Sequence, residues 1–309
     1  MRSGLDSLKG SRNSLAVDLI EALDPREYLR RLEYDPYPWQ VFTLERIRDG
    51  ATRLLLLGAR QGGRSTVTAG IPAYISKNEK ALSLIYAPGY EQGIDDIERV
   101  KEFIYRDDSY PPLVLDAMEH VKLPNGSFIK ANTSTAKTKR GKSKPRVIIF
   151  EEAAWIEDVL YKTVRPMLVM NPSCIVVGLT TPNGRKGWFH KAWAESTRWV
   201  KIMVKAPWEI EAGELVPAEP EKQFQKRMLA RGIHAFYSPR HTDRDFMVEE
   251  LEEHGETWFR QEYLCEFVEP EDQVFSYDQI DKIFTGREVK PVEFGLVKER
   301  DVAALEVRP

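Results

Sequence analysis

The most constraining stretch of the sequence runs from Arg53 to Thr66, where an apolar run, a glycine-rich turn and a polar segment follow one another. Leu54–Leu57 is wholly apolar, as expected of a parallel strand that is buried on both faces. The turn over residues 58–63 contains three glycines, and the segment from Ser65 onwards can begin a helix. A strand, a glycine-rich turn and a helix in this order are typical of a phosphate-binding loop.

The turn fits the consensus G-x-x-x-x-G-K-[ST] at every position except one, because Arg64 stands where lysine is expected. Glycines let backbone N–H groups converge on phosphate oxygens, and a helix N-terminus favours an anion. The hydroxyl of Ser65 is a candidate ligand for Mg²⁺. An ordinary glycine turn in an α/β protein remains the alternative for this motif taken alone.

Composition limits the class of protein. The 309 residues are 42% hydrophobic and carry a net charge of −3, so a sizeable core is possible and any DNA contact must come from local basic patches. The two cysteines, Cys174 and Cys265, lack metal-ligand spacing and suit a reducing cytosol. No apolar run has the length of a membrane span, and the N-terminus lacks a signal-peptide core. We therefore expect a soluble, intracellular protein with no membrane partner.

Upstream of the loop, residues 1–33 are expected to form a polar tail and two short helices, the second with Pro25 in its first turn. Tyr34–Gln40 contains two prolines and three aromatic residues, which favour a non-helical platform. The amide of Gln40 can donate and accept hydrogen bonds, which suits the edge of adenine. An aromatic cluster over one side of the sheet is the alternative, and it is favoured for this segment alone.

The most basic stretch lies between residues 137 and 146. Such charge runs are usually solvated, and contact with the phosphates of a nucleotide or of DNA is the functional alternative. The candidates for DNA contact are Lys137, Lys139, Lys142 and Lys144.

A further apolar strand, Val147–Phe150, ends in Glu151 and Glu152, at the edge where ligands bind in open α/β sheets. Adjacent carboxylates repel each other unless a cation lies nearby, and Mg²⁺ would meet that need. We expect Glu151 to support the metal and Glu152 to orient or deprotonate water. Two exposed loop acids are the alternative, and the phosphate-binding loop in the same chain favours the functional interpretation.

The next apolar strand begins near Cys174 and ends in Thr180 and Thr181, which could sense a γ-phosphate or the attacking water. A plain turn over Pro182–Gly184 is the alternative. Strands alternate with helices through residues 34–206, which predicts a mostly parallel sheet flanked by helices on both faces. Residues 207–221 are acidic and are expected to be a loop at a subdomain junction, and residues 236–243 are expected to be irregular.

Taken together, the motifs resemble those of a known family, the large terminase subunit of tailed bacteriophages, which packages DNA. The resemblance covers roughly residues 34–268, and the joint order of the motifs is more specific than any one of them. The matching segments are Pro38–Gln40, Ala59–Ser65, Arg140–Gly141, Glu151–Ala154, Thr180–Gly184 and Phe259–Phe267.

The resemblance implies a P-loop NTPase of the additional-strand, catalytic-glutamate (ASCE) type, with its core at residues 34–206 and a small C-terminal lid subdomain at residues 207–275. It implies ATP and Mg²⁺ as cofactors and the translocation of double-stranded DNA into a procapsid. It also implies a homo-oligomeric ring, a pentamer when assembled, in the host cytoplasm and docked on the procapsid. The portal protein and the small terminase subunit would be its partners.

The resemblance also assigns roles to individual positions. Glu152 and Arg64 would be catalytic, together with Arg140, which would reach the γ-phosphate held by a neighbouring subunit. Ser65 and Glu151 would hold the metal, and Thr180 and Thr181 would couple hydrolysis to movement. The residues that would bind the nucleotide are Trp39, Gln40, Gly58, Arg60, Gln61, Gly62, Gly63, Arg64, Ser65 and Thr66.

The chain departs from the family pattern at two positions. Arg64 replaces the usual lysine and keeps its charge, although it is bulkier, and Arg60 can share the phosphate contact. Glu151 stands where aspartate is commoner. Residues 276–309 resemble a linker and the first strand of the family's nuclease domain, but Leu296 and Val297 occupy the place of its first acid, so no nuclease activity is predicted. Another DNA-dependent, helicase-like ATPase and a nucleotide-binding assembly module with weak hydrolysis are the alternatives.

Overall fold

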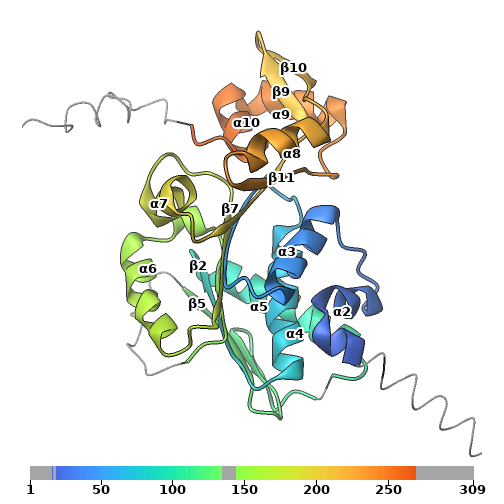
Figure 1. The fold of residues 1–309 in the computed structure, drawn as a ribbon, viewed down its shortest axis with the longest axis vertical. Coiled ribbons are helices and arrows are strands. Elements are labelled where there is room, and N and C mark those ends of the chain that lie inside the picture. The colour runs from blue at the N-terminus through green and yellow to red at the C-terminus, as the bar shows by residue number, and fades with distance from the viewer. Residues whose placement is uncertain (1–15, 17–18, 111, 134–143, 269–309) are drawn as a thin grey trace, which may run out of the picture. The chain divides into compact units, whose positions relative to one another are not determined.

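A nine-stranded sheet forms the centre of the computed structural model, which describes residues 16, 19–110, 112–133 and 144–268 (Figure 1). The strands from β11 to β5 pair in parallel, and β4 and β3 add to the far edge in antiparallel pairs. Across the sheet the strands are β11 (Ile233–Tyr237), β8 (Val200–Lys205), β1 (Arg53–Gly58), β7 (Ile175–Thr180), β6 (Val147–Phe150), β2 (Leu82–Ala87), β5 (Phe128–Thr133), β4 (His120–Lys122) and β3 (Leu115–Asp116). The predicted mostly parallel α/β sheet is confirmed.

Helices cover both faces of this sheet, as parallel strands require. One face carries α3 (Pro38–Arg48), α4 (Arg64–Asn78) and α5 (Tyr90–Arg106), and the other carries α6 (Asp158–Val164) and α7 (Gly187–Glu195) (Figure 1). Two short 3₁₀ helices, η1 (Ala153–Trp155) and η2 (Arg165–Val169), flank α6.

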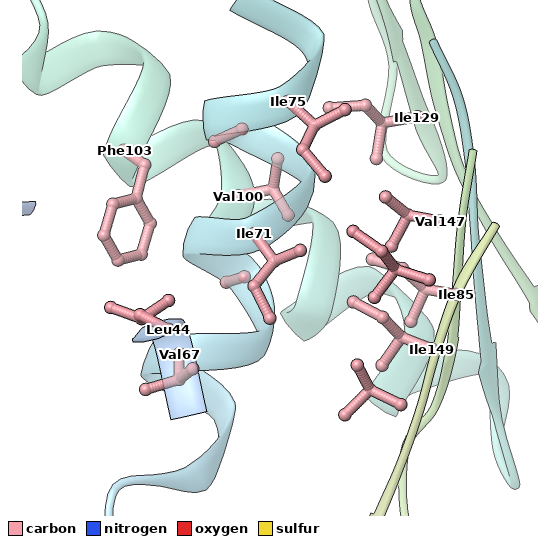
Figure 2. Close-up of a cluster of buried hydrophobic side chains, with 14 of the residues drawn as sticks. Leu44, Val67, Ile71, Ile75, Ile85, Val100, Phe103, Ile129, Val147 and Ile149 are labelled. Atoms are coloured by element: carbon pink, nitrogen blue, oxygen red, sulfur yellow. The ribbon is translucent and has the colours of Figure 1, made fainter. Parts of the chain in front are cut away.

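The apolar strands serve two separate cores. Alternate residues of β1 point to opposite faces, so Leu54 and Leu56 join the core beneath α4 while Leu55 and Leu57 join the core beneath α6 and α7. Figure 2 shows the first core, where Ile71 of α4 faces the side chains of the strands. Burial on both faces explains why these strands read as continuous apolar runs.

The strand order sets the class of the sheet. β7 lies between β1, which leads into the glycine turn, and β6, which leads into the paired glutamates. This inserted strand is the additional strand of the predicted ASCE layout. Because all three strands are parallel, their carboxyl ends meet at one edge of the sheet.

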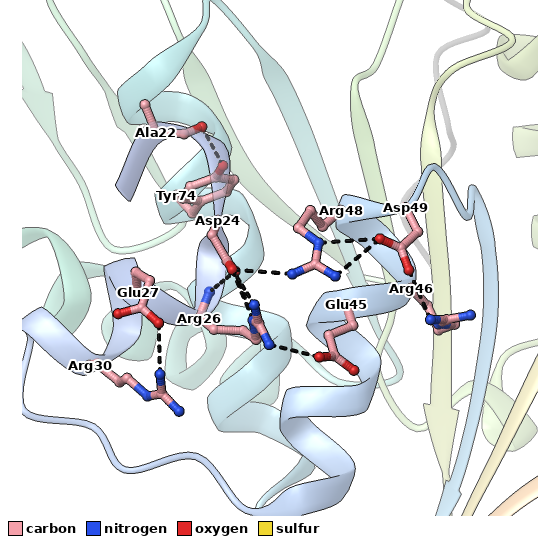
Figure 3. A network of polar contacts seen from close by, with 10 residues as sticks. All are labelled: Ala22, Asp24, Arg26, Glu27, Arg30, Glu45, Arg46, Arg48, Asp49 and Tyr74. Carbon is pink, nitrogen blue, oxygen red and sulfur yellow. Dashed lines mark hydrogen bonds and ion pairs between the residues drawn. The ribbon is translucent and has the colours of Figure 1, made fainter. Parts of the chain in front are cut away.

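The N-terminal helix α2 (Pro25–Arg31) begins as predicted, with Pro25 in its first turn and Asp24 as its cap. Tyr28 and Leu29 are buried in the first core. Figure 3 shows the polar network that ties α2 to α3, in which Arg26 contacts both Asp24 and Glu45. Helix α2 therefore packs on the sheet domain.

The expected non-helical platform at Tyr34–Gln40 is wrong at its end, because α3 already begins at Pro38. Proline fits the first turn of a helix, where its missing N–H has no partner to lose. Gln40 completes the cap by accepting a hydrogen bond from the backbone N–H of Tyr37 at 2.7 Å. Trp39 is fully buried in the first core.

The C-terminal part of the described chain is more regular than expected. Residues 207–221, expected to be a loop, contain the hairpin of β9 (Trp208–Glu211) and β10 (Glu214–Pro217). The expected irregular segment 236–243 begins inside β11, which pairs with β8 and so extends the main sheet. Three helices complete this part, α8 (Glu221–Leu229), α9 (Arg244–His254) and α10 (Glu256–Glu262). Within the ranges that the structure describes, no helix combines the length and the apolar character needed to cross a membrane.

Candidate active site

The glycine turn after β1 leads directly into α4, whose N-cap is Gly63. Gly63 has a φ of 89°, and a Cβ atom there would lie 3.2 Å from the Nε2 atom of Gln40, so both conformation and space favour glycine. No side chain caps the first N–H groups of α4. These N–H groups and the helix dipole form an anion-binding position at the carboxyl edge of the sheet.

Three neighbouring elements hold the turn in place. The backbone N–H of Ala59 donates to the carbonyl of Val204 in β8 at 2.7 Å, and that of Arg60 donates to the carbonyl of Glu262 in α10 at 2.8 Å. The side-chain amide of Gln40 donates to the carbonyl of Gly63 at 3.0 Å. Both polar atoms of the Gln40 amide thus have partners within the protein, and its contact with adenine stays a prediction.

Arg64 is buried behind the turn, although it stands where lysine was expected. Its Nη2 atom lies 3.4 Å from Oε1 of Glu152, whereas its Nη1 atom is buried and has no hydrogen-bond partner. An unsatisfied buried N–H group is costly, and a phosphate oxygen is a strong acceptor for a guanidinium. Gly58 makes room for this side chain, because a Cβ atom there would lie 2.8 Å from Cδ of Arg64.

Glu151 is buried at the end of β6 and accepts a hydrogen bond from Oγ1 of Thr68 at 2.8 Å. Burial raises the pKa of Glu151, and the nearby charge of Glu152 acts in the same direction. A bound cation would offset both effects. Mg²⁺ keeps several waters and usually binds one or two carboxylates together with substrate phosphates, so the chemistry of Glu151 suits it, and the metal contact of Ser65 stays a prediction.

Asp96 of α5 adds a third carboxyl group that the sequence did not single out. It is only 4% exposed, its Oδ2 atom has no hydrogen-bond partner, and its Oδ1 atom lies 3.5 Å from Nη1 of Arg99. Burial raises the pKa of Asp96, and the charge of Glu151 adds to the shift. Within the described residues, no group of three or more His, Cys, Asp and Glu side chains has the geometry to hold a metal alone.

Glu152 has a backbone φ of 44°, in the left-handed region that non-glycine residues rarely adopt. Such strain costs on the order of 1–3 kcal/mol and often occurs at functional sites. The Oγ1 atom of Thr180 lies 3.2 Å from Oε2 of Glu152 and also donates to the carbonyl of Thr181 at 2.6 Å. The ends of β1, β6 and β7 thus bring Arg64, Glu152 and Thr180 together.

Residues distant in sequence complete the site, and the sequence did not predict them. Arg240 donates to the hydroxyl of Tyr37 at 3.2 Å and to the carbonyl of Gln61 at 3.3 Å. The Nε2 atom of His241 lies 2.9 Å from the carbonyl of Arg60 and its Nδ1 atom 2.7 Å from Oγ of Ser238. Burial lowers the pKa of His241, so the neutral ring donates to Arg60 and accepts from Ser238. No local motif marks residues 238–241, because pairing of β11 with β8 places them.

A cavity of about 570 Å³ lies beside the turn. Arg60 and Gln61 border it on one side, and aromatic side chains of α9 and α10, including Phe246 and Trp258, border it on the other. The volume lies within the range of small-molecule sites. The site therefore combines a helix N-terminus that suits an anion with adjacent room for a larger ligand.

The remaining predicted residues are placed as follows. Arg60 is 59% exposed at its side chain, with Nη1 4.0 Å from Oε2 of Glu262. Gln61 is exposed, Thr66 is half-buried, and Lys144 is exposed. Lys137, Lys139, Arg140 and Lys142 lie outside the described residues.

The strand order, the glycine turn and the glutamates at the strand ends define a P-loop NTPase fold. The fold is similar to that of the large terminase ATPase domain of Thermus phage P74-26, with 18% identity, a TM-score of 0.56, and 78% of this chain and 97% of that chain covered. It is also similar to the large terminase of bacteriophage HK97, with 15% identity, a TM-score of 0.50, and 64% and 48% covered.

The large terminase of thermophilic bacteriophage D6E in complex with ATP-gamma-S gives a third similarity, with 8% identity, a TM-score of 0.50, and 75% and 53% covered. The chain thus spans about half of the HK97 and D6E structures. No family model and no curated protein sequence matches the chain. At these identities the similarities show a shared fold, that of phage large terminase ATPase domains.

Proposed function

We propose that this chain is the ATP-hydrolysing motor domain of a phage large terminase subunit, with Mg²⁺ as cofactor. The observation that carries the proposal is the meeting of Arg64, Glu152 and Thr180 at the carboxyl ends of β1, β6 and β7. A buried cation with an unpaired N–H group and a carboxylate with an adjacent hydroxyl are the groups that phosphoryl transfer to water needs. The D6E large terminase, which shares the fold, was solved with ATP-gamma-S.

In this proposal different residues of the chain bind the phosphates, activate the water and hold the metal. The N–H groups at the start of α4 and the free Nη1 of Arg64 bind phosphate oxygens. Glu152, fixed by its backbone conformation and by Thr180, orients and deprotonates the attacking water. Glu151 and Ser65 hold Mg²⁺, which would neutralise charge on the phosphates when bound. The nucleoside lies toward Gln40, Tyr37 and the cavity beside Arg60.

The wider role is part of the same proposal. Hydrolysis drives double-stranded DNA into a procapsid, with Lys137, Lys139, Lys142 and Lys144 as DNA contacts. Arg140 acts on the nucleotide of a neighbouring subunit in a homo-oligomeric ring, a pentamer when assembled. The portal protein and the small terminase subunit are its partners on the procapsid, in the host cytoplasm. Packaging of duplex DNA by purified components, rather than unwinding of a forked duplex, separates this role from that of a helicase-like ATPase.

Glu152→Gln tests the chemical step. The variant keeps the size of the side chain and its contact with Thr180 but cannot accept a proton, so ATP hydrolysis should fall by about 10²- to 10⁴-fold. Nucleotide affinity should stay within about threefold, as a titration with ATP-gamma-S would show. Glu252→Gln, at an exposed position on α9, is the matched control and should hydrolyse ATP like the parent. Undiminished hydrolysis in Glu152→Gln would remove Glu152 from its role.

A nucleotide-binding assembly module with weak hydrolysis is the second candidate, and one contact favours it. Arg64 replaces lysine and pairs with Glu152, so each group partly neutralises the other. Arg64→Lys distinguishes the candidates, because lysine carries a point charge without the planar fork that reaches Glu152. If the parent chain itself hydrolyses ATP, it is an ATPase rather than a module that only binds nucleotide. If only Arg64→Lys is active, the parent is a binding component.

A further inference from the structure

A second cavity, of about 550 Å³, lies on the opposite face of the sheet from α4, between the strands and the α6–η2 segment. Three arginines line it: Arg53 at the start of β1, Arg165 at the start of η2, and Arg198 just before β8. Arg53 is the first residue of β1 and Gly58 is the last. At a rise of about 3.3 Å per residue, roughly 16 Å of strand separates this cavity from the glycine turn. The arginine cavity is therefore a site of its own.

No aspartate or glutamate lines the arginine cavity. Among the described residues, neither Arg165 nor Arg198 forms an ion pair, and no aspartate or glutamate is among the groups that shift the pKa of Arg53. Burial lowers the pKa of Arg53, and Arg165 acts in the same direction. Arg165 and Arg198 are exposed, whereas Arg53 is half-buried like Arg26 and Arg146, which each have a carboxylate partner. Within the described part of the chain, no carboxylate thus balances the charge of this cavity.

The guanidinium of Arg53 is held in a fixed position. Its Nη1 atom donates to the carbonyl of Thr52 at 2.6 Å and to that of Cys174 at 2.8 Å. These bonds use one nitrogen and leave Nε and Nη2 without a protein partner in the described chain. A fixed guanidinium with free N–H groups matches the planar, bidentate geometry of a phosphate or carboxylate.

Aromatic side chains line the same cavity as the arginines. The ring of Tyr161 stacks on that of Trp188 with centroids 4.1 Å apart and an interplanar angle of 7°, and the guanidinium of Arg165 lies 5.8 Å from the centroid of Tyr161. Trp199 and Ser196 also line the cavity. Flat aromatic rings next to arginines suit a ligand that has an anionic part and a planar part.

We propose that the arginine cavity binds a phosphate-bearing ligand of nucleotide size, with its phosphate on Arg53, Arg165 and Arg198. The planar part of the ligand lies against Tyr161 and Trp199. The volume is that of a small-molecule site, and no carboxylate is present to act as a base, so this is a binding site rather than a second active site. A free nucleotide and a nucleotide of a DNA strand share this chemistry. The proposal does not depend on hydrolysis at the glycine turn.

The test is a calorimetric titration of the full chain with AMP, without Mg²⁺, in an Arg64→Ala background that weakens the phosphate-binding turn. The parent background should bind AMP with one site, and Arg165→Gln/Arg198→Gln should weaken this binding about tenfold or more. Arg244→Gln, at an exposed arginine on α9, is the matched control and should leave it unchanged. Equal affinity in the double variant and the control, or no binding of AMP at millimolar concentration, would overturn the proposal.

A competition experiment identifies the source of the phosphate. A short DNA duplex that displaces AMP, with the same dependence on Arg165 and Arg198, supports the site as a DNA-backbone contact. Displacement by free nucleotides alone supports it as a nucleotide site. In both cases affinity should fall as salt rises, because the charges that bind the phosphate are partly screened. Because the Arg64→Ala background already lacks the turn's arginine, loss of AMP binding in the double variant cannot be confused with failure of the proposed ATPase site.

Discussion

Arginines lie near both ends of β1, but their charged surroundings differ. At the carboxyl end Arg64 is paired with Glu152, and Thr180 contacts the same carboxylate. At the amino end Arg53 faces Arg165 and Arg198 with no carboxylate in the cavity. The first arrangement supplies a cation and a base together, which suits a reaction. The second supplies cations alone, which suits binding.

The comparison also separates what a motif can reveal from what only the fold can. The glycine turn and its arginine lie in one continuous stretch of sequence, so their chemistry can be read there. The arginines of the second cavity are spread over residues 53–198, and each one alone looks like an ordinary surface charge. They become a site only because the fold brings the start of β1, the start of η2 and the segment before β8 around one cavity.

Replacing Gly58 should have the largest effect of these changes, because it disturbs the Arg64–Glu152 arrangement at the carboxyl end of β1. In Gly58→Ala the new methyl group would lie 2.8 Å from Cδ of Arg64, so the guanidinium must leave its place beside Glu152. We expect the free energy of unfolding to fall by about 1–3 kcal/mol, as for overpacked cores, in a urea titration. ATP hydrolysis should fall about tenfold or more, because the proposed function requires Arg64 to bind phosphate and the substitution displaces it.

Gly89→Ala is the control for this change, since a Cβ atom at Gly89 meets nothing within 4 Å and its backbone is extended. It should leave both hydrolysis and unfolding close to those of the parent. If Gly58→Ala behaves like Gly89→Ala, then the position of Arg64 does not matter to the site.

At Glu151 we expect an effect of intermediate size, on how the free energy of unfolding depends on pH. Burial raises the pKa of Glu151, so the folded protein holds a proton that the unfolded chain releases, and stability should decrease as the pH rises above the ordinary pKa of glutamate. Glu151→Gln removes the charged form. The variant should therefore gain stability over the parent by an amount that grows to on the order of 1–3 kcal/mol between about pH 5 and pH 8.

Thermal unfolding without Mg²⁺ measures this difference in stability. Both proteins keep the same polar and charged neighbours of position 151, which are Thr68, Glu152, Arg64, Arg99 and Asp96. Addition of Mg²⁺ and ATP-gamma-S should raise the Tm of the parent more than that of the variant, because the ion would displace the proton from Glu151. Glu252→Gln, whose carboxylate is exposed on α9, should show no such pH dependence. A constant difference across pH would mean that Glu151 is charged throughout.

The smallest expected change in stability is in the arginine cavity, at the amino end of β1. Arg165 is exposed and has no carboxylate partner in the described chain, so Arg165→Gln should raise the free energy of unfolding by less than about 0.5 kcal/mol at low salt. The gain should disappear at high salt, where repulsion among the three arginines is screened. A urea titration at two salt concentrations measures it, with Arg244→Gln for comparison. A loss of stability that does not depend on salt would contradict the idea of unbalanced charge.

Local sequence patterns were sufficient for the framework of this fold. The apolar run Leu54–Leu57 predicted a strand buried on both faces, and the glycine turn predicted the start of α4 to within one residue. Parallel strands bring their carboxyl ends to one edge, so the positions of Glu151 and Thr180 relative to the turn could be expected. These predictions needed only the chemistry of neighbouring residues.

The rest depends on contacts between distant segments. β11 forms because Ile233–Tyr237 pairs with β8, and this pairing carries Arg240 and His241 to the glycine turn. Asp96 reaches Glu151 because α5 packs beside β2 and α4, and its charged neighbours in the sequence gave no sign of burial. At Pro38 a local rule does account for the outcome, because proline fits the first turn of a helix as well as a loop.

Glu262 gives the glycine turn a mechanical property. Its backbone carbonyl holds the N–H of Arg60, and its carboxylate lies 3.4 Å from Oγ1 of Thr181 and 4.0 Å from the guanidinium of Arg60. One residue of α10 is therefore a common anchor for the turn after β1 and for the residue that follows β7. The position of the turn and the position of the residue after β7 therefore depend on the same side chain and backbone carbonyl.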